Sequence, residues 1–379
     1  MKCIHCNTDS TYRDRQANRN SCKSCRHPFA FEPKTDSLTV SDTLFARAIK
    51  DVSADDTLSF TPRQLWYEFN RRLLARKTFS CGSAALLILL GGGLLYRFPH
   101  IPPMLIGLPA LLMAALPKKS KLTGPRYPKL SYAMFEGMYL QKWIATHGKI
   151  AKMLPPTRSD NHSGGGRDFR GRSPAETLGA QDVTSYSFDR ALVVENADIA
   201  AMLVANQFHF ENNCAILSLD GYPFGTAATI MTMLARNPNL KVFALHDASV
   251  KGCWTTQMLR QSAWFPDTSV RLIDLGLRPQ HVIKGGLIML QGPPRKLQVG
   301  TTSTSLTAEE IAWLEQGNTA ELFALRPHKL MRAIYQGFAR AGQTDDATVG
   351  PDGMIFVDTG PSIWIYDSGA DVFASDSFG

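Results

Sequence analysis

The sequence of this 379-residue chain predicts a multidomain fold: a small cysteine-rich unit, a two-helix hydrophobic hairpin, and an α/β domain with a mainly parallel sheet. Three observations predict it: paired cysteines near the N-terminus, two adjacent apolar segments, and a downstream alternation of short apolar strands with helices. The parts that we expect are residues 1–35, 36–77, 78–117, 118–154, 155–182, 183–341 and 342–379.

The first part, residues 1–35, contains two Cys-x2-Cys motifs separated by fifteen residues, Cys3/Cys6 and Cys22/Cys25. Each motif places two thiolates on one tight turn, and four thiolates are the ligands of a tetrahedral zinc site. A redox site needs only one such motif. We therefore predict a zinc ribbon whose Zn²⁺ is structural, because no coordination position stays open. Its basic side chains suit contact with nucleic acid and docking to a protein equally well.

The second part, residues 36–77, is expected to be helical. Leu44 and Ala48 follow a helical period, and a second helix begins at Thr61-Pro62, since Pro is favoured in the first turn of a helix. The segment contains Arg63 and Tyr67 one helical turn apart.

Residues 78–117 are predicted to form a transmembrane hairpin. The segment 78–96 has no charge over nineteen residues, and the segment 101–116 is apolar over sixteen. A spanning helix needs about 20 apolar residues. Lys and Arg flank both outer ends, so the positive-inside rule places both termini and the α/β domain in the cytoplasm, with the hairpin in the cell membrane. A buried hairpin of a soluble protein and a re-entrant hairpin are the alternatives.

The next parts are simpler. Residues 118–154 predict a helical segment that packs in the core or on the membrane surface. Residues 155–182 are rich in Gly, Pro, Ser and Arg, which is typical of a flexible linker. The acidic C-terminal part, 342–379, is expected to form a β-hairpin.

The α/β domain is expected at residues 183–341. Helices should separate its four apolar strands, and this order is typical of a parallel sheet with helices on its faces. The expected strands are 191–194, 214–219, 241–247 and 270–273. A capped helix after Thr307 and helical structure at 319–341 complete the domain.

Two acidic residues end strands of this sheet. Glu195 follows the first strand and Asp247 ends the third. Ligands of open parallel sheets bind at the carboxyl ends of the strands, and Mg²⁺ prefers carboxylate oxygens. Acids also occur at strand ends by chance, so their spacing alone leaves a Mg²⁺ site and plain solvated acids both open.

Several short motifs resemble a Toprim domain, most closely that of the topoisomerase VI A subunit and its meiotic double-strand-break relatives. The resemblance covers about residues 42–77 and 188–340. The motifs are Leu-Val-Val-Glu195, Gly221-Tyr-Pro223, Leu245-His-Asp247 followed by Gly252, Leu275-Gly-Leu-Arg-Pro279, Ala320-Glu-Leu-Phe-Ala-Leu-Arg-Pro327, and the winged-helix-like Thr61-Pro-Arg63-Gln-Leu-Trp-Tyr67.

The resemblance implies a chemistry. The Tyr67 hydroxyl would attack a DNA phosphodiester and form a phosphotyrosyl link, with Arg63 contacting the phosphate. Glu195 and Asp247 would bind Mg²⁺, which positions and neutralises the phosphate. The resemblance also implies a homodimer, or a multi-protein complex that works with a separate ATPase.

Two features depart from the family. Its Asp-x-Asp pattern reads Asp247-Ala-Ser249 here, and Asp220, at the end of the second strand, is the candidate replacement for the missing ligand. The hydrophobic hairpin also begins eleven residues after Tyr67, where the winged helix should finish. Tyr67 is therefore either a nucleophile or a packed helix residue.

Three functions follow from these patterns. The first is a membrane-anchored Toprim-like DNA-binding protein with metal-dependent DNA cleavage, in defence or DNA processing. The second is a catalytically degenerate binding module or sensor that recruits DNA or proteins to the membrane. The third is a membrane effector, in which the α/β domain senses a nucleotide or a partner and the hairpin damages the membrane.

Overall fold

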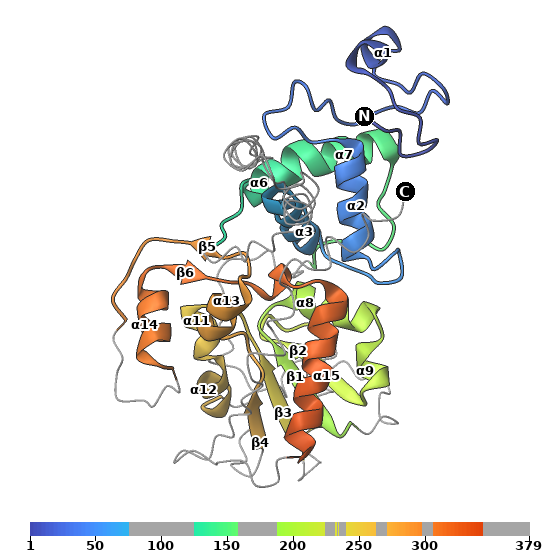
Figure 1. Cartoon of the computed structure of the whole chain (residues 1–379). Coiled ribbons are helices and arrows are strands. Elements are labelled where there is room, and N and C mark those ends of the chain that lie inside the picture. The colour runs from blue at the N-terminus through green and yellow to red at the C-terminus, as the bar shows by residue number, and fades with distance from the viewer. Residues whose placement is uncertain are drawn as a thin grey trace, which may run out of the picture. The chain divides into compact units, whose positions relative to one another are not determined.

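The computed structural model describes residues 1–75, 125–157, 188–223, 240–262, 271–297 and 306–343, with positions 232 and 234 (Figure 1). Contacts divide the chain into two compact units, Met1–Leu73 with Pro125–Gly379, and Leu74–Gly124. The predicted hairpin at 78–117, most of the linker at 155–182 and nearly all of the C-terminal part lie outside the described residues. Within the described ranges, no helix has the length and apolar character needed to cross a bilayer.

The N-terminal ribbon consists of two similar turns joined by helix α1 (Tyr12–Ala17). In each turn the residue after the second cysteine has a positive φ, 57° at Asn7 and 61° at Arg26. Its backbone N–H donates to the first cysteine of the motif, at 3.0 Å in both turns. This repeated backbone path brings both cysteines of each motif to one side of the turn.

A helical layer follows the ribbon. It contains α2 (Asp42–Val52), α3 (Pro62–Ala75) and a continuous run made of α6 (Tyr132–Met134), the π-helical segment η1 (Phe135–Leu140) and α7 (Gln141–His147). Aromatic rings form its core; those of Phe45 and Trp143, for example, lie 4.7 Å apart. The expected helix that begins at Thr61-Pro62 is confirmed.

The sheet of the α/β domain is parallel throughout (Figure 1). Its strand order is β2-β1-β3-β4. The strands are β1 (Arg190–Val194), β2 (Cys214–Ser218), β3 (Lys241–Leu245) and β4 (Arg271–Asp274). The predicted mainly parallel α/β domain is therefore confirmed.

Alternate residues of the strands pack on opposite faces of this sheet. Ala191, Val193 and Val242 belong to one apolar cluster, which also contains Leu259 of α12 (Thr255–Arg260). On the other face, the ring of Phe243 lies 4.5 Å from that of Phe338 in α15 (Pro327–Gln343). Helices α8 (Ala197–Ala205) and α9 (Phe208–Glu211) also pack beside β2. Both faces of the strands are thus buried, as parallel sheets require.

The remaining elements follow the third and fourth strands. They are α11 (Val250–Cys253), α13 (Pro279–Gly285), β5 (Leu290–Gln291), α14 (Ala308–Glu315), β6 (Asn318–Thr319) and the short helix η3 (Leu322–Ala324). Strands β5 and β6 form an antiparallel pair. Thr307 caps α14 together with Glu310, which confirms the expected helix start.

Buried polar contacts join the helical layer to the segment before α15. Glu68 of α3 accepts two hydrogen bonds from the Arg326 guanidinium, at 2.8 and 3.0 Å. The side chains are 1% and 7% exposed, respectively. Gln64 adds a hydrogen bond to the Leu325 carbonyl at 3.2 Å. These contacts fix helix α3 against the end of the α/β domain, although 258 residues separate Glu68 from Arg326.

Histidines join the ribbon to the helical layer. A ring nitrogen of His27 lies 3.2 Å from one of His147, whose other nitrogen lies 2.9 Å from the Asp42 carboxylate. Asp42 is fully buried and also accepts the backbone N–H groups of Ala30 and Phe31. The ribbon thus packs against the helical layer of the same chain.

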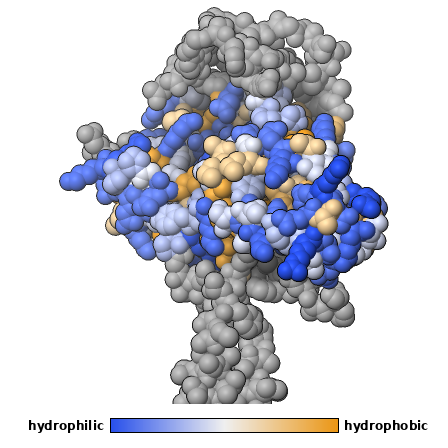
Figure 2. Space-filling model, turned by 90° about the horizontal axis from the view of Figure 1, so that it is seen from above, coloured by the Kyte–Doolittle hydropathy of each residue, from blue (hydrophilic) through white to orange (hydrophobic). Residues whose placement is uncertain are grey.

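The face seen in Figure 2 carries mainly hydrophilic side chains among the described residues, with hydrophobic ones scattered among them.

Candidate functional site

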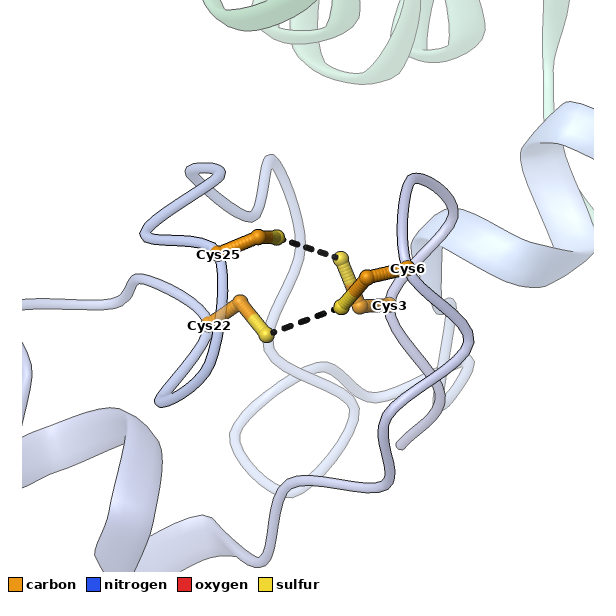
Figure 3. Close-up of side chains that lie close together, drawn as sticks. All are labelled: Cys3, Cys6, Cys22 and Cys25. Carbon is orange, nitrogen blue, oxygen red and sulfur yellow. Dashed lines mark hydrogen bonds between the residues drawn. The ribbon is translucent and has the colours of Figure 1, made fainter.

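The four N-terminal cysteines form a compact cluster (Figure 3). Their sulfur atoms all lie within 4.8 Å of one another. The Sγ atoms of Cys3 and Cys25 are 3.7 Å apart, and those of Cys6 and Cys22 are 3.6 Å apart. Each close pair takes one thiol from each motif, so the two turns face each other.

This donor set fits zinc. With Zn–S bonds of about 2.3 Å, a tetrahedral site places its sulfur atoms about 3.8 Å apart. The two close sulfur pairs agree with that spacing. Hydrogen bonding between Cys6 and Thr8, through the Thr8 side chain and backbone, lowers the pKa of Cys6 to about 6, which favours the thiolate. The predicted four-cysteine cluster is confirmed, and it is compatible with structural Zn²⁺.

The sheet brings Glu195 and Asp247 together at the carboxyl ends of β1 and β3. These strands are hydrogen-bonded neighbours, and the backbone N–H of Glu195 donates to the Leu245 carbonyl at 2.9 Å. Glu195 Oε2 accepts the backbone N–H of Asp247 at 3.0 Å. We call these two residues the acid pair. Its position is the one expected for ligands of a parallel sheet.

Burial and electrostatic repulsion within the acid pair both act on the pKa of Asp247. Burial, followed by the negative charge of Glu195, raises the pKa of Asp247 from its ordinary 3.8 to about 7. The raised pKa persists although Asp247 Oδ1 accepts the backbone N–H of Leu322 at 2.7 Å, which favours the carboxylate. A bound cation would relieve this repulsion, so the pair has the electrostatics of a cation site.

Helix α11 lies close against the acid pair because it contains Gly252. A Cβ atom at this position would lie 2.1 Å from the Asp247 carbonyl oxygen and 3.1 Å from Glu195 Oε2. The helix also carries Lys251, whose Nζ is 3.8 Å from Glu195 Oε1. Ser249 does not supply a carboxylate; its hydroxyl caps α11 by accepting the Gly252 N–H at 2.9 Å.

Asp220 has a different role from the acid pair in this structure. Its Oδ2 accepts the backbone N–H of Ala197, in the first turn of α8, at 3.2 Å. Among the described residues, the four cysteines are the sole group of three or more His, Cys, Asp or Glu whose ligand atoms all lie within 4.8 Å. Asp220 therefore does not complete a three-carboxylate cluster with Glu195 and Asp247.

Helix α3 places Tyr67 and Arg63 beside a third acid, Glu321. The Tyr67 hydroxyl donates to Glu321 Oε2 at 3.2 Å, and Tyr67 is fully buried. Burial, with the nearby Glu321 charge, raises the pKa of Tyr67 well above its ordinary value. Arg63 donates to both carboxylate oxygens of Glu321, at 2.5 Å each. In this arrangement the Tyr67 hydroxyl is protonated and closed off from solvent.

Glu321 is the site residue that sequence reasoning missed. It lies in the motif Ala320-Glu-Leu-Phe, just before η3, and no strand end or spacing marks it as functional. Its segment reaches the acid pair because Ala320 and Ala248 exchange two backbone hydrogen bonds of 2.9 Å. The sequence offers one sign of its role: Glu321 is the acidic residue of a motif that resembles the Toprim family.

Comparisons with known proteins add no relative: no family model, curated protein or solved structure matches this chain. The likeness to Toprim domains therefore rests on the sequence motifs themselves.

Proposed function

We propose that this chain is a membrane-anchored, Toprim-like DNA-binding protein in which Glu195 and Asp247 bind Mg²⁺, and the Mg²⁺ in turn binds a DNA phosphate. The observation that carries the proposal is the acid pair, which joins two neighbouring strand ends through a hydrogen bond and in which the pKa of Asp247 is raised. A divalent cation bound there would lower the repulsion between the carboxylates and offer its remaining positions to phosphate oxygens.

Helix α3 supplies the second part of the proposal. Arg63 and Tyr67 meet Glu321, and the residue after Glu321 donates its backbone N–H to Asp247. Arginine binds phosphate through two parallel hydrogen bonds, so Arg63 suits a phosphodiester. In the cleavage reaction, the Tyr67 oxygen would lose its proton, attack phosphorus and form a phosphotyrosyl ester, while a deoxyribose oxygen leaves and takes up a proton as a free hydroxyl. The four cysteines would hold structural Zn²⁺, and the hairpin at 78–117 would anchor the chain with its α/β domain in the cytoplasm.

A second candidate, a binding module without catalysis, is favoured by two specific observations. Tyr67 is fully buried with its hydroxyl on Glu321, and Ser249 stands where the family pattern has a metal-binding acid. Such a module would recruit DNA or partner proteins to the membrane, as a homodimer or within a complex that includes an ATPase.

One experiment separates the two candidates. Full-length chain in mild detergent is mixed with labelled DNA duplex, with and without Mg²⁺ or Mn²⁺, and both binding and covalent protein–DNA adducts are measured. The cleavage proposal expects metal-dependent adducts that Tyr67→Phe abolishes while DNA binding remains. Binding without adducts supports the module. Absence of DNA binding at low salt, where phosphate contacts are strongest, contradicts the cleavage proposal and the DNA-recruiting form of the module, and leaves only the form that recruits partner proteins.

A further inference from the structure

The Arg63 guanidinium sits in a site built from rings and one carboxylate. Its two-point ion pair with Glu321 holds one edge. Three aromatic rings surround the rest, with centroids 5.1 to 5.8 Å from the guanidinium carbon, which is within reach of a cation–π interaction. The rings are those of Trp66, Tyr132 and Phe323. They fix the guanidinium whichever anion binds the edge that Glu321 holds here.

Solvent reaches this ion pair. The side chains of Arg63 and Glu321 are 32% and 18% exposed, whereas those of Arg326 and Glu68, a few residues away along the same segments, are 7% and 1% exposed. A carboxylate and a phosphate present the same pair of acceptor oxygens to arginine. The acceptor on Arg63 is thus exchangeable, while the acceptor on Arg326 is enclosed.

Glu321 also restrains the Tyr67 hydroxyl. Its Oε2 accepts from both Arg63 and Tyr67. The following backbone N–H, that of Leu322, donates to the Asp247 carboxylate at 2.7 Å. A single short segment therefore contacts the arginine, the tyrosine and the acid pair, and any movement of the Glu321 side chain frees two of these groups together.

We propose that Glu321 occupies a phosphate-binding position: a DNA backbone phosphate replaces its carboxylate on Arg63 and thereby frees the Tyr67 hydroxyl. The inference rests on the proposed DNA-binding function and adds to it the site of one phosphate and a residue that controls access. One anion replaces another, so no covalent bond changes in this step. Glu321 acts as a positioning residue, because it works through Arg63 and Tyr67.

The test measures DNA affinity of the full chain, zinc-loaded and in mild detergent, by fluorescence anisotropy with a short labelled duplex. Glu321→Gln removes the competing charge, and we expect it to tighten binding about tenfold, equivalent to roughly 1.4 kcal/mol. Adding Arg63→Gln to Glu321→Gln should abolish the gain. Glu310→Gln is the matched control, since Glu310 pairs with Arg278 through two hydrogen bonds of 3.1 and 2.7 Å in a pair that Tyr67 does not join; it should give no gain.

A spectroscopic readout reports on Tyr67 itself. The chain is labelled with fluorotyrosine, and Tyr67→Phe assigns its ¹⁹F resonance. We expect Glu321→Gln and added duplex to shift this resonance in the same direction. Glu321→Asp keeps the charge for folding but shortens the side chain, and it should shift the resonance likewise.

Two results would overturn the inference in distinguishable ways. If wild-type chain binds the duplex, Glu321→Gln binds no more tightly and the Tyr67 resonance stays fixed, Glu321 does not occupy a phosphate position, while DNA binding stands. If no variant binds the duplex, both the inference and the proposed function fail. If the duplex binds tightly to Glu321→Gln but not to the wild type, the inference is supported.

Discussion

The ribbon and the acid pair are assembled at very different distances along the chain. All four cysteines lie within residues 3–25, and two turns with matching backbone paths bring them together. The acid pair needs two strands of a sheet, and Tyr67 approaches it through Glu321, 254 residues further along the chain. The ligands of a local motif can be predicted from their spacing in the sequence, whereas a site built from distant segments depends on the whole fold.

The ribbon should respond most strongly to a single substitution. Cys22→Ser removes one of four thiolates from a fully buried position. Zinc binding supplies about 10 kcal/mol or more of folding free energy in zinc-finger peptides, so the ribbon should lose its metal and unfold. Elemental analysis should find one zinc per wild-type chain and much less in the variant, and amide exchange should accelerate over residues 1–31.

Cys214→Ala is the control for this experiment. Cys214 is a buried cysteine in β2, and it does not belong to the four-cysteine cluster. It should retain the zinc of the wild type. Equal zinc content in Cys22→Ser and Cys214→Ala would contradict the zinc assignment.

The junction between α3 and α15 should show the next largest effect. Glu68→Gln removes the buried carboxylate that accepts two hydrogen bonds from Arg326 and leaves Asp51, at 3.6 Å, as an acidic neighbour of that guanidinium. Breaking a buried ion pair in this way typically costs about 3–5 kcal/mol. Urea unfolding, followed by circular dichroism, measures the loss. The matched control is Asp55→Asn, which breaks the exposed pair with Lys50, whose two side chains are 68% and 73% exposed. It should cost at most about 1 kcal/mol, and equal losses in both variants would disprove a buried charge network.

The fold was predictable to the extent that local patterns encode it. The strands at β1 to β4 and the cap at Thr307 followed from apolar runs and from one capping box. The acid pair followed from strand ends. Glu321 was missed, because its role comes from a contact with Arg63 across 258 residues, and an acidic side chain within a motif is a weak signal by itself. Ser249 was identified as a departure, but its role as the cap of α11 required the backbone geometry.

The raised pKa of Asp247 should make the metal affinity of the acid pair depend on pH. Asp247 must lose its proton to bind a cation, and its pKa lies near 7 in the metal-free protein. Mn²⁺ affinity should therefore rise about tenfold per pH unit up to pH 7 and then level off. Calorimetry across this range measures it, and a flat profile below pH 7 would contradict the shift.

The same shift affects the metal-free fold. Because the folded pKa of Asp247 exceeds its ordinary value of 3.8, its contribution to stability is complete below pH 3.8 and is lost as pH rises through about 7. Asp247→Asn should flatten this part of the pH–stability curve measured by urea unfolding. An unchanged slope would show that Asp247 titrates normally.

The smallest effect is expected where the ribbon docks. His147→Ala removes the ring between His27 and Asp42, and a hydrogen bond of this kind contributes about 1 kcal/mol. Amide exchange in the ribbon should accelerate several-fold at unchanged zinc content. Thr146→Ala, next to it on α7, removes a hydroxyl that donates to the Lys142 carbonyl within the same helix, and it should change neither quantity. Loss of zinc in His147→Ala would instead show that docking maintains the metal site.

The most direct test of the central claim is Mn²⁺ binding by the full, zinc-loaded chain, followed by calorimetry at a pH above 7. Wild type is compared with Glu195→Gln, Asp247→Asn and Asp220→Asn. We predict one Mn²⁺ beyond the zinc in wild type, and its loss in both variants of the acid pair. Loss in Asp220→Asn as well would add Asp220 to the ligands. No Mn²⁺ binding by the wild type would contradict the claim that Glu195 and Asp247 form a cation site.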